Sequence, residues 1–85
     1  MSKIVLDLHP LCRDGRAIDE ALSRALNEAV ARKIDQVEII PGKGSGQLKK
    51  RVLRFLDRKD IRQTYHRLKK DSKNWGRLWV YFRHG

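Results

Sequence analysis

The glycine-rich run Pro41-Gly42-Lys43-Gly44-Ser45-Gly46 constrains the fold of this chain more than any other feature. It follows the apolar stretch Val37–Ile40 and precedes the amphipathic stretch Gln47–Leu56, which is the order of a strand, a tight loop and a helix. Glycines let the backbone approach a ligand closely, and the free N–H groups at a helix start attract anions. We therefore predict a phosphate-binding loop formed by Gly42, Lys43, Gly44, Ser45 and Gly46, with Ser45 as the helix cap.

The chain before this loop predicts a strand and a helix. Ile4–His9 is rich in β-forming residues at its start and is closed by Pro10, as expected for a short strand. Asp14 is placed to cap a helix that follows. The apolar side of that helix is expected at Ile18, Leu22, Leu26 and Val30, which recur at helical spacing.

The chain after the loop predicts a second helix and two more strands. Ile61–Leu68 is expected to form the third strand, and Lys69–Asn74 a loop. Arg77–Arg83 alternates between two kinds of side chain, as a half-buried strand does. The apolar stripe of the second helix is expected at Leu48, Val52, Phe55 and Leu56, and the buried side of the last strand at Leu78, Val80 and Phe82.

These elements define the fold class as an α/β two-layer sandwich with the order β-α-β-α-β-β. The 85 residues suffice for one domain, covering 1–85. A strand-helix-strand unit normally makes a right-handed parallel crossover, so the first two strands should be parallel. Two helices cannot cover both sides of a four-stranded mixed sheet, and we therefore expect both helices on one face. The open face should carry Asp7, His9, Arg77, Trp79, Tyr81 and Arg83.

The positive charge of the chain is concentrated in its second half. Residues 1–42 carry six Lys or Arg against seven Asp or Glu, whereas residues 43–85 carry fourteen against three. A one-sided positive excess is typical of proteins that bind nucleic acid or an anionic membrane. No apolar run approaches the roughly 20 residues of a membrane-spanning helix, so we expect a cytoplasmic protein without a membrane partner. Cys12 is the only cysteine, which excludes an intramolecular disulfide and a cysteine-based metal cluster.

Asp7 and His9 form the candidate catalytic pair, because residues two apart on a strand share one face. The His9 imidazole is suited to take a proton from water or from a ribose 2′-hydroxyl, while Asp7 orients it or helps to hold a divalent ion such as magnesium or manganese. The structural alternative is that an Asp-x-His at a strand end only hydrogen-bonds neighbouring loops. Parallel strands end at one edge of a sheet, so we expect this pair to meet Lys43.

Basic and aromatic residues of the second half are the candidate nucleic-acid contacts. Cations on the second helix suit phosphates, and aromatics interleaved with arginines suit bases. The alternatives are that the charges only solvate a helix face and that the aromatics only shield an uncovered sheet. The predicted contacts are Lys49, Lys50, Arg51, Arg54, Trp75, Arg77 and Trp79, and the surface is expected to extend over Tyr65, His66, Arg67, Lys69 and Lys70.

Three segments resemble the Smr (small MutS-related) domain in order and spacing: Leu6-Asp7-Leu8-His9, Asp19-Glu20-Ala21-Leu22, and Ile39 through Lys49 with the glycine loop inside it. The resemblance implies a β-α-β-α-β-β two-layer fold and binding to DNA or RNA. In several members it implies structure-selective nicking or RNA cleavage. The catalytic residues of the family's L-D-x-H strand then correspond to Asp7 and His9, and its phosphate-approaching G-K-G loop to Gly42, Lys43 and Gly44.

The sequence thus leaves a leading hypothesis and two alternatives. The leading one is a monomeric Smr-like domain that binds DNA or RNA and cleaves a phosphodiester with His9 as acid and base. The first alternative is a module that binds DNA or RNA without catalysis. The second is an adaptor whose basic face docks an acidic protein. No small-molecule substrate is indicated.

Overall fold

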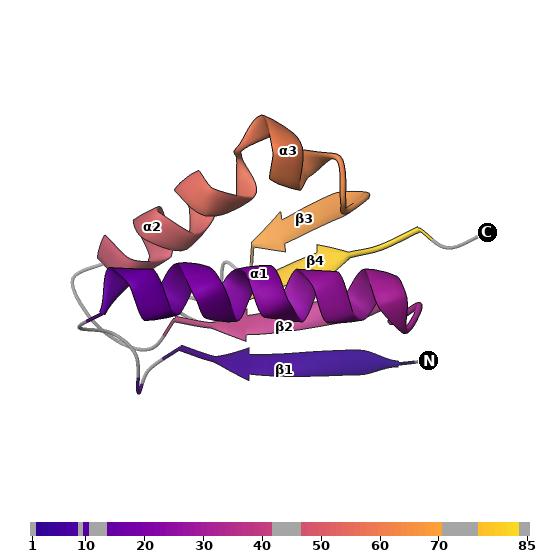
Figure 1. Cartoon of the computed structure of the whole chain (residues 1–85), viewed down its shortest axis with the longest axis horizontal. Helices are drawn as coiled ribbons and strands as arrows, with labels where there is room; N and C mark the ends of the chain where they lie inside the picture. Colours follow the sequence, from indigo (N-terminus) through magenta and orange to yellow (C-terminus); the bar gives the residue numbers. More distant parts are fainter. Residues whose placement is uncertain (1, 9, 11–13, 42–46, 71–76, 84–85) are drawn as a thin grey trace.

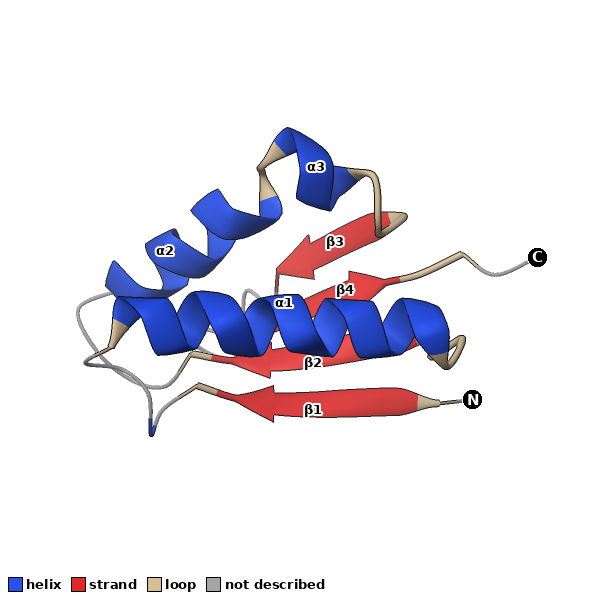
Figure 2. Cartoon of the chain, in the orientation of Figure 1, coloured by secondary structure: helices blue, strands red, loops and turns tan. Residues whose placement is uncertain are grey.

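The computed structural model describes residues 2–8, 10, 14–41, 47–70 and 77–83. The elements follow the order β1 (Lys3–Asp7), α1 (Gly15–Ala31), β2 (Gln36–Ile40), α2 (Gln47–Leu56), α3 (Lys59–Arg62), β3 (Arg67–Lys70) and β4 (Leu78–Tyr81). The strands form one four-stranded sheet in the order β1-β2-β4-β3, in which β1 and β2 are parallel and the other neighbours antiparallel (Figure 2). The predicted mixed sheet and element order are confirmed, with the short helix α3 as an addition.

Helices α1 and α2 lie on the same face of the sheet and bury one apolar layer between them and the strands (Figure 1). Leu22 of α1, Val52 of α2 and Val80 of β4 are fully buried in this layer. The inward positions predicted for the last strand are confirmed, because Leu78, Val80 and Phe82 all belong to the core. Among the described residues, no helix combines the length and apolar character needed to cross a membrane.

Both ends of α1 are defined by specific hydrogen bonds. The Asp14 carboxylate accepts hydrogen bonds from the backbone N–H groups of Arg16 at 3.1 Å and Ala17 at 3.2 Å, which confirms the predicted cap. At the other end Lys33 has a positive φ of 54°. The Ile34 N–H donates to the Ala29 carbonyl at 2.8 Å across this turn, which is the pattern usually built around glycine.

One predicted core position of α1 is wrong. Val30 is 47% exposed, whereas the neighbouring Ala29 is fully buried. The helix turns through about 100° per residue, so its inward side at the last turn passes through Ala29 rather than Val30. The other predicted positions, Ile18, Leu22 and Leu26, are buried as expected.

The predicted strand Ile61–Leu68 is wrong over most of its length. Residues 59–62 form α3, and the strand begins only at Arg67 and continues to Lys70, through residues predicted as a loop. Local contacts favour the turn: the Thr64 hydroxyl donates to the Ile61 carbonyl at 2.6 Å, and the Tyr65 hydroxyl to the Leu56 carbonyl at 2.7 Å. Tyr65 therefore closes the end of α2, and burial raises the pKa of its hydroxyl.

Candidate nucleic-acid interface

The elements that carry the predicted site residues meet at one edge of the sheet. The parallel strands β1 and β2 finish side by side, with Asp7 in register with Ile40 and the Leu8 N–H donating to the Ile40 carbonyl at 2.9 Å. Helices α1 and α2 both begin at this edge (Figure 1). Carboxyl ends of parallel strands and helix starts are the usual place for a ligand in an open α/β sheet.

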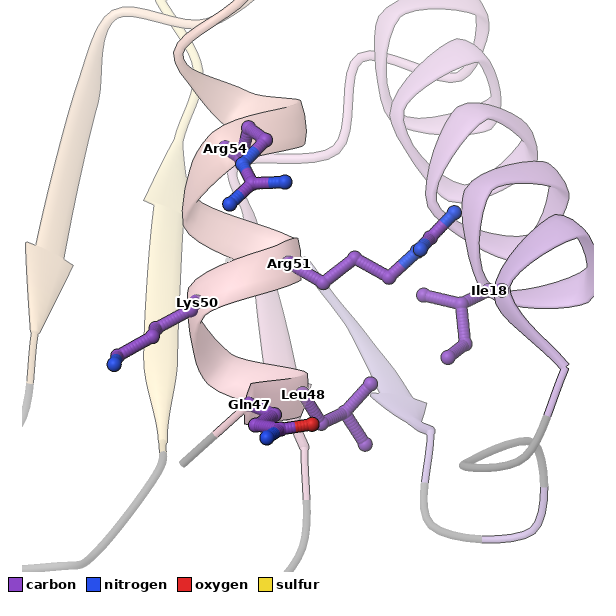
Figure 3. Close-up of a pocket in the computed structure, with 7 residues that line it drawn as sticks. Ile18, Gln47, Leu48, Lys50, Arg51 and Arg54 are labelled. Carbon is purple, nitrogen blue, oxygen red and sulfur yellow. The ribbon is translucent and has the colours of Figure 1, made fainter. Parts of the chain in front are cut away.

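A hollow of about 360 Å³ lies between the start of α1 and the start of α2. Ile18 and Leu48 give it apolar walls, and Lys50, Arg51 and Arg54 of α2 also line it; Arg51 extends toward α1, whereas Lys50 extends away from α1 (Figure 3). A second hollow of about 270 Å³ shares Arg51 and Arg54 with the first and extends to Arg58. We call the two together the α1/α2 groove, lined by Gly15, Ile18, Asp19, Gln47, Leu48, Lys50, Arg51, Arg54, Phe55 and Arg58.

Arg51 crosses this groove from α2 to α1 (Figure 3). Its Nε and Nη2 donate to the Oδ1 and Oδ2 atoms of Asp19 at 3.4 and 3.1 Å, a two-point contact. The guanidinium also rests against Gly15, where an added Cβ would lie 2.6 Å from Arg51 Cζ. Asp19 and the absence of a side chain at Gly15 thus hold Arg51 in the groove, and its charge is already partly compensated.

Lys50 and Arg54 are the α2 cations that face solvent without an acidic partner among the described residues. One helical turn separates them, so they lie on one side of α2. Arg58 lies two residues beyond the end of α2 and is paired with Asp60 at 3.2 Å, and its guanidinium lies 5.6 Å from the centre of the Phe55 ring. We call Lys50, Arg54 and Arg58 the α2 stripe. Lys49 is half-buried and does not line the groove.

The opposite, open face of the sheet contains an acidic centre that the sequence analysis missed. Glu38 of β2 is 7% exposed and accepts a hydrogen bond from Trp79 Nε1 at 3.3 Å. The same carboxylate pairs with Lys3 Nζ at 3.2 Å and with Arg77 Nη1 at 3.5 Å. Burial raises the pKa of Glu38, but the hydrogen bonds from Lys3 and Trp79 and the charges of Lys3 and Arg77 outweigh it, so its pKa lies below the ordinary value.

The predicted site residues therefore lie in separate regions of the molecule. The start of α2 brings Lys50, Arg51 and Arg54 together on the helical layer. Asp7 is exposed at the sheet edge where α2 also begins. Arg77 and Trp79 lie on the open face and contact Glu38. The remaining predictions, His9, Gly42, Lys43, Gly44, Ser45, Gly46 and Trp75, fall outside the described residues.

One signal in the sequence points to the missed residue. Glu38 interrupts the apolar run between Val37 and Ile39, and an acid flanked in this way on a central strand needs cationic or donor partners. No such signal identifies Asp19 as the partner of Arg51, because the two residues are far apart in the chain. The described part of the chain contains no group of three His, Cys, Asp or Glu side chains placed to hold a metal ion.

Comparisons with known proteins agree with this geometry. A family model described as the Smr domain matches residues 6–83. The crystal structure of the Smr domain of Thermus thermophilus MutS2 is similar in fold, with a TM-score of 0.74 and 18% sequence identity, over 99% of this chain and 100% of that chain. No curated protein sequence matches the chain.

Proposed function

The chain belongs to the Smr domain family, and we propose that it binds nucleic acid through the α2 stripe and the mouth of the α1/α2 groove. The family is one of nucleic-acid-binding domains. The observation that carries the proposal for this chain is the pair Lys50 and Arg54, two exposed cations on one side of α2 without acidic partners among the described residues. Such a pair gains more from a phosphate than a cation that already has a carboxylate.

The position of the stripe also suits a phosphate chain. It starts where α2 begins, so the positive end of the helix dipole adds to the charge of Lys50. Arg54 follows Lys50 by four residues, about 6 Å along the helix axis, which is close to the spacing of phosphates along a strand, and Arg58 follows just beyond the end of α2. The stripe is therefore expected to contact successive phosphates, with Arg51 deeper in the groove beside Asp19.

The test is a titration of fluorescein-labelled duplex and single-stranded oligonucleotides, read by fluorescence anisotropy. The double variant Lys50→Glu/Arg54→Glu should lose affinity by about 100-fold or more at low salt. The control Arg24→Glu/Lys33→Glu makes the same change of charge at two other exposed positions, one within α1 and one just after the end of α1. It should lose far less.

Equal losses of affinity in the two variants would show that binding depends only on the net charge of the protein and not on the α2 stripe. Unchanged affinity in Lys50→Glu/Arg54→Glu, with circular dichroism showing a folded protein, would remove α2 as the contact surface. Binding of an acidic protein but of no oligonucleotide would favour the adaptor hypothesis.

We also propose, as a second step, that the edge beside the groove cleaves a phosphodiester. Asp7 is exposed where β1 ends, beside Ile40 and next to the start of α2. The sequence places His9 two residues further on and Lys43 after the neighbouring strand. The family resemblance assigns Asp7 and His9 to catalysis and Gly42, Lys43 and Gly44 to phosphate contact. The α2 stripe would then hold the polyanion next to these groups.

In this scheme the His9 imidazole accepts a proton from water while the water oxygen bonds to phosphorus. The bond from phosphorus to the leaving oxygen breaks, and the imidazolium gives its proton to that oxygen. Asp7 orients the imidazole and stabilises its charged form. An RNA substrate allows the 2′-hydroxyl to replace water as the nucleophile.

Cleavage is tested with labelled single-stranded RNA and branched DNA, each with magnesium, with manganese and with a chelator. His9→Ala should abolish product, and His84→Ala is the matched control because it removes another histidine that the proposal does not use. Product that is absent from every reaction of the unaltered protein, or equal in His9→Ala, leaves a binding module without catalysis.

A further inference from the structure

The open face of the sheet carries a second surface, on the side away from the helices. Successive residues of a strand point to opposite faces, so Trp79 and Tyr81 project from this face while Leu78 and Val80 enter the core. Arg67 of β3 lies opposite Tyr81, and Lys69 lies opposite Trp79. Two aromatic rings on the inner strand are therefore flanked by two cations on the edge strand.

This part of the face is hollowed. His66, Arg67, Lys69 and Tyr81 line a cavity of about 320 Å³. The His66 N–H donates to the Tyr81 carbonyl at 2.8 Å, which extends the β3–β4 ladder by one residue and fixes His66 beside the hollow. Tyr81 is half-buried, while the three residues around it are exposed. The tyrosine thus forms part of the floor, and charged and polar side chains form the rim.

The cations of the open face differ in whether they have an acidic partner. Glu38 of β2 pairs with Lys3 of β1 at 3.2 Å and with Arg77, the residue before β4, at 3.5 Å. On the β3 side, Arg67 and Lys69 have no acidic partner among the described residues. Arg67 and Lys69 therefore place positive charge without an acidic partner among the described residues along β3, next to Tyr81.

We infer that the hollow lined by His66, Arg67, Lys69 and Tyr81 binds an unpaired nucleic-acid strand, with a base stacked on Tyr81 and phosphates on Arg67 and Lys69. A flat aromatic ring accepts a base only if that base is free of its own duplex stack. Cations at alternate positions of a strand follow an extended backbone. A duplex keeps its bases stacked inside and therefore gains little from the tyrosine.

This surface adds to the α2 contact and shares its ligand class, but it does not depend on it. The α2 stripe lies on the helical layer, and the β3 hollow lies on the opposite layer. A substrate with both paired and unpaired parts would engage the two surfaces at once.

The test compares single-stranded dT and U oligomers of about 12 nucleotides with a blunt hairpin duplex, by fluorescence anisotropy. Arg67→Glu/Lys69→Glu and Tyr81→Ala should each weaken single-strand binding by about tenfold or more and duplex binding much less. Tyr81→Phe should retain single-strand binding, because the ring remains. The variant Arg24→Glu/Lys33→Glu again controls for net charge, and Lys50→Glu/Arg54→Glu reports separately on α2.

A direct readout is photocrosslinking with an oligomer that contains 5-iodouracil, which should give an adduct at Tyr81. The proposal is overturned if neither oligomer binds, if Arg67→Glu/Lys69→Glu lowers duplex and single-strand affinity equally, or if Tyr81→Ala folds and binds as the unaltered protein does. It is also overturned if Arg67→Glu/Lys69→Glu leaves nucleic-acid binding unchanged and forms dimers. In that case the two cations only prevent the edge strand β3 from pairing with a second copy of the chain.

Discussion

The guanidinium of Arg51 in α2 makes a two-point contact with the carboxylate of Asp19 in α1, at 3.4 and 3.1 Å. Both side chains are partly exposed, so the pair itself contributes only about 0–1 kcal/mol to the free energy of unfolding. Its position in the α1/α2 groove matters more. Asp19 competes with any phosphate that approaches Arg51.

Asp19→Asn should therefore tighten nucleic-acid binding by a few-fold while it lowers stability by less than about 1 kcal/mol. The slope of log affinity against log salt should steepen by about one unit, because Arg51 then releases an additional counterion. Anisotropy titrations at several salt concentrations measure both quantities. Glu20→Gln, which neutralises a neighbouring exposed acid, is the control; an equal gain there would show that only net charge matters.

Neutral replacement of the stripe should change the salt dependence rather than only the affinity. Lys50→Gln/Arg54→Gln is expected to reduce the slope for duplex DNA by about 1.8, since each lost phosphate contact removes about 0.9. Titrations between about 50 and 200 mM salt determine the slope. A lower affinity with an unchanged slope would mean that these side chains act without touching phosphates.

Glu38 should make the stability of the domain depend on pH. Its pKa in the folded protein lies below the ordinary value of 4.5, so its stabilising contribution is present above that value and is lost as the pH falls through the lowered pKa. Urea unfolding of the unaltered protein and of Glu38→Gln should differ most at neutral pH and converge in acid. A difference that stays constant across this range would contradict the assignment.

Lys33 occupies a backbone conformation that favours glycine, with φ of 54° at the end of α1. Lys33→Gly should raise the free energy of unfolding by about 0.5–1 kcal/mol, because glycine adopts this conformation without a Cβ clash. Lys33→Ala removes the same side chain but keeps the Cβ, and it should give no such gain. Thermal and urea unfolding of the three proteins check this directly.

The exposed Val30 and the buried Leu26 provide a matched test of the core. Leu26→Ala should cost about 2–5 kcal/mol, because it leaves a cavity beneath α1. Val30→Ala should change stability by less than about 1 kcal/mol, since almost half of its surface is already in water. Comparable losses in the two variants would place Val30 in the core after all.

The elements with strong periodic patterns were predictable from the sequence. Asp14 predicts the start of α1, and the glycine run followed by Gln47–Leu56 predicts α2. Both predictions are possible because helix caps and apolar spacing are local properties of the sequence. The segment between Arg58 and Lys70 was not predictable in the same way. Its β-forming residues are few, and a short helix, a tyrosine hydroxyl and pairing with β4 together decide its structure.

The candidate site was likewise predictable only where it depends on local sequence spacing. Clustering of Lys50, Arg51 and Arg54 follows from helical spacing and needs no tertiary information. Which of these cations is already paired depends on contacts between distant residues, such as Asp19 with Arg51 and Glu38 with Arg77. Sequence spacing can place a charge on a face, but only the packed structure shows what compensates it.

Gln36 at the start of β2 pairs with Lys3 at the start of β1 and with Tyr81 at the end of β4, so β1 begins and β4 finishes at the end of the sheet opposite the start of α2 (Figure 1). An affinity tag or a tethered fluorophore joined at either terminus would thus emerge away from the groove. Immobilising the domain through such a handle should leave the α1/α2 groove accessible to molecules in solution, whereas Arg67 and Tyr81 of the β3 hollow lie at the same end as the handle.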